Sequence, residues 1–199
     1  MTGNTLPRLL VVVAGFLFCS GCTGTSMNVN PDPESIKLSV IKKCGAVAIK
    51  ESPADHVYAP AGNLVPGFAT ALEKSGLSDN VYYPTRPDDK VDVILDTKFD
   101  VVFDANMGGN LTKSFFTGFT LFLLEPVFWF NYDYSLRGKV DILEGKNRVK
   151  TVQANSEGEM AMKFLSLSEV QKLEGETLKR AKESVYKQLL SEISNYCNK

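Results

Sequence analysis

Apolar and polar residues alternate along the chain between Val91 and Asp104. On one side of this stretch the positions are apolar apart from Thr97, and the other side carries five charged residues. A period of two residues is typical of a β-strand with one face turned to the core and one to solvent. The pattern therefore predicts a long, half-buried strand over 91–104.

The same alternation predicts further strands. Residues 134–143 alternate in the same way, and a glycine-containing turn at 144–147 leads to another strand at 148–155. Short runs of small and β-branched residues at 45–50 and 81–83 predict two more. The three long strands follow one another closely, as in an antiparallel meander.

Two segments have helical spacing instead. Residues 64–75 place apolar side chains three and four positions apart and are followed by Gly76, a common helix terminator. Near the C-terminus, six residues continue a stripe of this kind from Leu178 onward: Leu178, Ala181, Val185, Leu189, Ile193 and Tyr196.

The order of these elements indicates the fold class. It is strand, helix, four strands and a final helix, and the last helix has an apolar stripe that matches the apolar face of the strands. We therefore predict an α+β two-layer sandwich with a mainly antiparallel sheet, covered by the C-terminal helix. This single domain should occupy 36–199, with an apolar insertion at 111–131.

The insertion contains the most hydrophobic stretch of the domain, residues 115–130. It lacks a period of two and includes the chain's only tryptophan. Three interpretations are open: a buried part of the core, a loop that enters a membrane, or a docking patch for a protein partner. Under the last two, the contact residues are Phe115, Phe116, Phe119, Phe122, Phe128, Trp129 and Phe130.

The N-terminus has the pattern of a secretory signal peptide. An apolar run at 9–16 follows Arg8 and leads into Leu17-Phe18-Cys19-Ser20-Gly21-Cys22. Small residues directly before a cysteine resemble the lipobox of bacterial lipoproteins. That resemblance implies a signal peptide at 1–21 and attachment of diacylglycerol to Cys22, which would become the first residue of the mature chain.

The lipobox resemblance also implies a location. Thr23 follows the cysteine, where an aspartate would resemble an inner-membrane retention signal. We therefore expect a lipid anchor in the outer membrane, with the domain facing the periplasm. Residues 22–35 are polar and rich in proline, so we expect a flexible tether between the lipid and the domain.

The remaining cysteines indicate a disulfide bond. If Cys19 leaves with the signal peptide and Cys22 carries lipid, Cys44 and Cys197 remain in an oxidising compartment. We therefore predict a bond between them. No metal site is expected, because one histidine and no closely spaced cysteine pair do not provide zinc ligands.

The net charge argues against nucleic acid as a partner. The net charge is −1, so the chain has no basic excess with which to bind nucleic acid.

Four aspartates recur every four residues: Asp92, Asp96, Asp100 and Asp104. Neighbours in such a row are roughly 13 Å apart on a strand, too far for one cation. We expect them to pair with Arg137 and Lys139 across the sheet.

No enzyme signature is recognisable, and no cofactor is expected. His56 stands alone in a proline-rich loop, without a nucleophile motif. The element order resembles lipoproteins of the curli-secretion and penicillin-binding-protein-activator types, and residues 119–126 followed by 132–134 resemble a motif of uncharacterised lipoproteins. These resemblances imply envelope assembly or maintenance through protein contacts.

We therefore predict a non-catalytic, membrane-anchored lipoprotein that binds a protein or another envelope component. Two alternatives stay open: a carrier or sensor of lipid or another apolar ligand that uses residues 115–130 as a pocket wall, and a hydrolase whose catalytic groups meet only in space.

Overall fold

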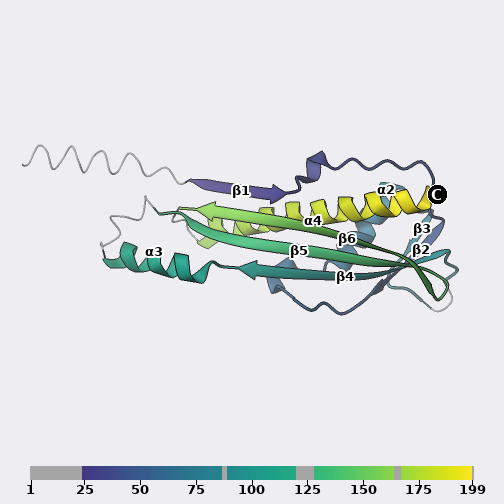
Figure 1. The fold of residues 1–199 in the computed structure, drawn as a ribbon, viewed down its shortest axis with the longest axis horizontal. Coiled ribbons are helices and arrows are strands. Elements are labelled where there is room, and N and C mark those ends of the chain that lie inside the picture. Colours follow the sequence, from purple (N-terminus) through teal and green to yellow (C-terminus); the bar gives the residue numbers. More distant parts are fainter. Residues whose placement is uncertain (1–23, 87–88, 120–127, 164–166, 199) are drawn as a thin grey trace, which may run out of the picture.

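The computed structural model describes residues 24–86, 89–119, 128–163 and 167–198, which form one sheet with two helices packed on one face and a third that extends beyond its end (Figure 1). The strands are β1 (Thr25–Asn30), β2 (Ala46–Glu51), β3 (Asn80–Tyr82), β4 (Val93–Asp104), β5 (Phe130–Glu144) and β6 (Asn147–Met162). The helices are α2 (Val65–Ser75), α3 (Met107–Phe119) and α4 (Leu167–Cys197), with short 3₁₀ turns η1 (Pro33–Ser35) and η2 (Ala59–Ala61).

The sheet has the order β1-β6-β5-β4-β2-β3. Strand β2 runs parallel to its neighbours β3 and β4, and the other pairings are antiparallel. The predicted α+β class and mainly antiparallel sheet are therefore confirmed. The meander of three long strands is also confirmed, as β4, β5 and β6.

Helix α4 lies along the apolar face of the sheet, as predicted. Its side chains Leu178, Val185 and Leu189 are buried. The helix approaches closely because β5 has a glycine under it: a Cβ added at Gly138 would lie 2.8 Å from Val185 Cγ1. The polar face of the sheet faces away from α4 and α2.

The predicted disulfide bond is confirmed. Cys44 and Cys197 are bonded across a sequence separation of 153 residues, with their Cα atoms 5.2 Å apart. The bond ties the chain just before β2 to the last residue of α4. In the chain-entropy model, closing a loop of this length stabilises the fold by up to about 5 kcal/mol.

The prediction of a flexible tether at 22–35 is wrong for the residues that the structure describes. Residues 25–30 form the edge strand β1, which pairs with β6 from Thr25 opposite Met162 to Asn30 opposite Glu157. Val29 is buried, and η1 follows immediately. The reason is that β6 extends past the end of the predicted strand and its outer edge needs hydrogen-bond partners, which β1 supplies.

The carboxylate row on β4 also has a different role from the one expected. Asp100 accepts the backbone N–H groups of Asp55 and His56, at 2.6 and 3.0 Å, and Asp96 accepts the Ser52 hydroxyl at 2.6 Å. These carboxylates therefore hold the loop after β2 against the sheet. Lys139 forms its ion pair with Asp141 on its own strand rather than with the row.

Candidate functional site

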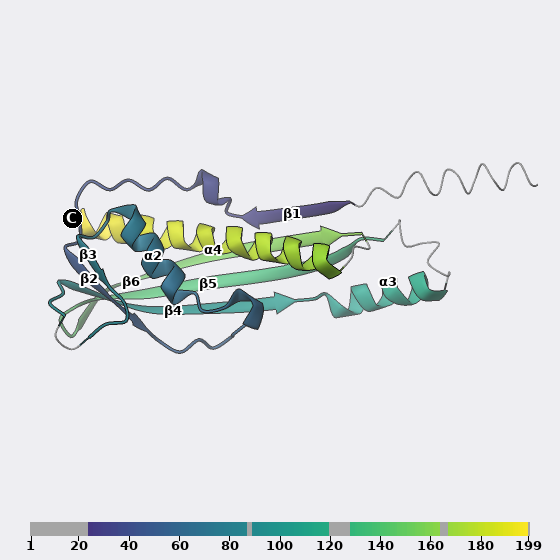
Figure 2. The same cartoon turned by 180° about the vertical axis from the view of Figure 1, so that it is seen from behind.

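Helix α3 has an apolar row on its exposed side. Met107, Leu111, Phe115 and Phe119 follow at intervals of four residues, and their exposed fractions are 68, 68, 68 and 79%. Phe115 and Phe119 stack on each other with ring centroids 6.4 Å apart. The helix extends beyond the sheet, away from the C-terminal end of α4 (Figure 1, Figure 2).

A polar residue attaches the inner side of this helix to the sheet. The Asn110 side chain is 8% exposed, and its amide donates to the carbonyl oxygens of Ala105 and Asn131 at 2.7 and 2.8 Å. Its carbonyl accepts the N–H of Asn131 at 3.3 Å. Two of these three hydrogen bonds fix α3 to Asn131 near the start of β5, and the apolar row of the helix is left facing outward.

Trp129 connects α3 to the first described residues of the chain. A Cβ added at Gly24 would lie 2.6 Å from Cη2 of Trp129, so the indole ring packs directly on this glycine. Lys163 places its ammonium 5.4 Å from the ring centroid, and Lys113 of α3 donates to the Trp129 carbonyl at 2.5 Å. Together α3, Trp129 and Gly24 form what we call the aromatic end of the molecule.

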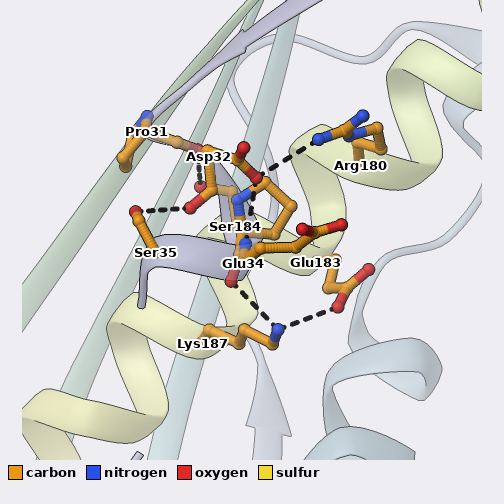
Figure 3. Close-up of polar contacts among 9 residues, drawn as sticks. Pro31, Asp32, Glu34, Ser35, Arg180, Glu183, Ser184 and Lys187 are labelled. Carbon is orange, nitrogen blue, oxygen red and sulfur yellow. Dashed lines mark hydrogen bonds and ion pairs between the residues drawn. The ribbon is translucent and has the colours of Figure 1, made fainter. Parts of the chain in front are cut away.

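The segment after Gly24 is fixed on α4 as well as on the sheet (Figure 3). Ser184 donates to the Pro31 carbonyl at 2.7 Å, and Arg180 pairs with Asp32 at 3.2 Å. The Glu34 N–H and the Arg180 guanidinium hold the pKa of Asp32 below its usual value. Lys187 donates to the Pro33 carbonyl at 3.0 Å.

The structure separates the seven predicted contact residues. Phe115, Phe116 and Phe119 are exposed, so the interpretation of these residues as core is wrong. Trp129 is 38% exposed, whereas Phe128 and Phe130 are half-buried. Phe122 and the predicted lipid attachment residue Cys22 lie outside the described residues.

A second group of polar side chains lies where α4 meets the aromatic side chains of β4 and β5, and its members Tyr58 and Glu174 are partly buried. Tyr58 donates to Glu174 at 2.5 Å and stacks on Phe103 with centroids 4.9 Å apart. Burial and the Glu174 carboxylate raise the pKa of Tyr58 to about 12, and burial also raises the pKa of Tyr134. Tyr58 therefore stays protonated at neutral pH and acts as a donor that ties its loop to α4.

Two further observations concern the described residues as a whole. No helix among them has both the length and the apolar character needed to cross a bilayer. Within the same ranges, no three His, Cys, Asp or Glu side chains are grouped so that they could hold a metal ion.

Solved structures similar to this one include one lipoprotein, a DUF330 protein and a homologue of a hemagglutinin. Uncharacterised lipoprotein B from Nitrosomonas europaea has 11% identity and a TM-score of 0.42, over 80% of this chain and 85% of that chain. A DUF330 protein from Xanthomonas campestris has 13% identity and a TM-score of 0.44, over 81% and 92%. A neuraminyllactose-binding hemagglutinin homologue from Helicobacter pylori has 10% identity and a TM-score of 0.41, over 80% and 88%.

No family model matches the sequence, and no curated protein matches it. The identities and TM-scores of the solved structures are too low to support an inference about activity or partners. The site must therefore be interpreted from its own residues.

The attachment of α3 through Asn110 can be tested by Asn110→Ala. We expect the free energy of unfolding to fall by about 1–3 kcal/mol, since the variant leaves Asn131 without its side-chain partner. Amide hydrogen exchange in α3 should become faster while exchange in α4 is unchanged. The exposed Asn155→Ala is the matched control and should change stability by less than about 0.5 kcal/mol. Unchanged protection of α3 in Asn110→Ala would show that other contacts hold the helix.

Proposed function

We propose that this protein is a bacterial lipoprotein that is anchored through lipid on Cys22 and holds its aromatic end in the same membrane. At that surface it acts as a non-catalytic component that binds a protein or another constituent of the cell envelope. One observation carries the proposal: the exposed apolar row of α3 lies at the same end of the molecule as Gly24, two residues after Cys22.

Chain geometry supports a common membrane for both attachments. Two residues span at most about 7 Å, so a lipid on Cys22 would begin close to Trp129, which packs on Gly24. Because β1 is paired with β6 from Thr25 onward, the domain has no long flexible segment here to carry it away from the bilayer.

The energetics of α3 favour a membrane over water. Fully burying one phenylalanine side chain is worth about 1.5–3 kcal/mol, and α3 leaves Phe115 and Phe119 largely exposed. Aromatic rings and lysines are typical of the membrane interface, where Trp129 and Lys163 would lie. At about 1.5 Å per residue, a helix of 13 residues is about 20 Å long, too short to cross a hydrocarbon core of about 30 Å. Because α3 continues the long axis of the domain, it would enter the bilayer with its outer end only (Figure 1).

Orientation would determine which surfaces can meet a partner. With the aromatic end in the bilayer, the opposite end with the Cys44–Cys197 bond points away from it (Figure 1). The polar sheet face and the helical layer then remain accessible. The outer membrane and its periplasmic side are the proposed location, on the basis of Thr23 after the lipobox-like cysteine.

The alternative in which residues 115–130 form the wall of a lipid-binding pocket has less support. The apolar row of α3 points outward, and the described residues 115–119 and 128–130 are absent from the linings of four hollows in the described part of the chain. The segment is better suited to enter a membrane than to enclose a ligand.

Membrane contact by α3 can be measured without the lipid anchor, because residues 24–198 include every described strand and helix. Phe115→Ser/Phe119→Ser should weaken binding to phosphatidylethanolamine–phosphatidylglycerol vesicles by about tenfold or more, as two exposed rings no longer enter the bilayer. Vesicle flotation measures this, and the melting temperature should not change.

The matched control is Ile41→Ser/Val149→Ser, which removes two exposed apolar side chains, 82 and 46% exposed, outside the aromatic end. This control should bind vesicles like the parent domain. Equal loss in both double variants, or loss in neither, would contradict membrane contact through α3.

The anchor itself is tested on the native protein by mass spectrometry of its N-terminal peptide. We expect a chain that begins at Cys22 and carries a diacylglyceryl group, and Cys22→Ser should release the protein from the membrane fraction. A native chain with another first residue, or an unmodified Cys22, would contradict anchoring at this position.

A further inference from the structure

An apolar groove is lined by residues of α2 and α4. The two helices lie on the same side of the sheet (Figure 2). Its volume is about 600 Å³, within the range of ligand pockets in proteins. Its apolar lining includes Leu38, Ala71, Leu178 and Leu190. Nothing in the mechanism of membrane anchoring requires this groove.

Two glycines shape the groove in different ways. Gly67 of α2 packs on Tyr186 of α4, where an added Cβ would lie 2.8 Å from the hydroxyl oxygen. Tyr186 in turn donates to the Leu64 carbonyl at 2.6 Å, which fixes this wall. On α4, Gly175 faces open space, since an added Cβ would meet no atom within 4 Å.

Lysines surround this apolar surface on both helices. Lys74 of α2 and Lys179, Lys182 and Lys187 of α4 line the groove, together with a single carboxylate, Glu183. Glu183 is already paired with Lys187 at 3.0 Å (Figure 3). In the ranges that the structure describes, no ion pair is formed by the other three lysines.

Of these three lysines, Lys182 is the one that is partly buried. Its ammonium donates to the Ala61 carbonyl at 2.5 Å, and burial lowers its pKa. A neutral carbonyl compensates only part of the cost of taking a charge out of water. An anionic group bound beside Lys182 would offset the remainder, because an opposite charge stabilises the ammonium.

We propose that this groove binds a monoacyl anionic lipid, with the acyl chain between α2 and α4 and the headgroup among the lysines. The apolar lining accounts for the chain, and the excess of lysines over carboxylates accounts for a negative headgroup. Helix α2 has 11 residues, about 16 Å, which suits a short ligand better than the several turns of a docked partner helix.

The proposal is independent of membrane contact by the aromatic end, because no residue of α3 lines the groove. Lipid binding in the groove and membrane contact by α3 can therefore be contradicted separately. A groove that binds lipid should do so in the Phe115→Ser/Phe119→Ser variant as well as in the parent domain.

The test is calorimetric titration of the domain 24–198 with lysophosphatidylglycerol below its micelle-forming concentration. We expect saturable binding that is about tenfold or more tighter than binding of lysophosphatidylcholine with the same chain, and no binding of glycerol phosphate. Lys74→Glu/Lys179→Glu should weaken binding about tenfold, since both side chains are exposed on the rim. Gly175→Leu should also weaken it, by filling the groove from a position with open space.

The matched control for charge is Lys146→Glu/Lys172→Glu, which makes the same change in net charge outside the groove. It should bind within about twofold of the parent domain. Melting temperatures establish that each variant folds. Absence of saturable binding to the parent domain, equal affinity for the two lysolipids, or unchanged affinity in Lys74→Glu/Lys179→Glu would overturn the proposal.

Discussion

The pairing of β1 with β6 fixes the N-terminal segment of the described chain against the domain. Six residues that would otherwise link the N-terminus loosely to the domain become an edge strand, from Thr25 to Asn30. The contacts of Asp32 with Arg180 and of Pro31 with Ser184 then fasten the following turn to α4. Because the chain is fixed from its first described residues, the place where it leaves the domain is fixed too.

The chain leaves the domain beside α3, whose apolar row faces solvent and whose polar residue Asn110 faces the sheet. Asn110 binds the sheet through its amide, whereas the row that includes Leu111 and Phe115 faces outward. An apolar helix face that stays exposed does not stabilise the fold. Such a local conflict between sequence and fold is usually found where the residues serve a function. We propose that this conflict is resolved because α3 and a lipid on Cys22 enter the same apolar phase, so that two attachments orient one domain.

Strong periodicity made most of the fold predictable. The alternation that identified β4 and the stripe of α4 at Leu178, Val185 and Leu189 both correspond to buried faces in the structure. The disulfide bond between Cys44 and Cys197 was predictable from cysteine number and compartment, because only two thiols remained after the N-terminal pair was assigned.

The parts that were missed lack such signals. The second half of β6 alternates glutamates with small residues and methionines, so the apolar periodicity there is too weak to predict a strand. Without that half of β6, the sequence offers no partner strand for β1. Periodicity also cannot tell whether an apolar helix face turns inward or outward, which left residues 115–130 open. The groove brings Lys74 and Lys179 together from helices far apart in sequence, a juxtaposition that only the packing of α2 on α4 reveals.

The chain's only tryptophan provides the most direct test of the central claim, because Trp129 lies at the aromatic end and is 38% exposed. The measurement is Trp129 emission from the domain bound to vesicles whose acyl chains carry bromine at known depths. If the aromatic end enters the membrane, the emission of Trp129 is shifted to the blue and is quenched most strongly by bromine near the headgroups. Emission that stays at its aqueous wavelength and is not quenched at any depth would show that the aromatic end remains outside the membrane.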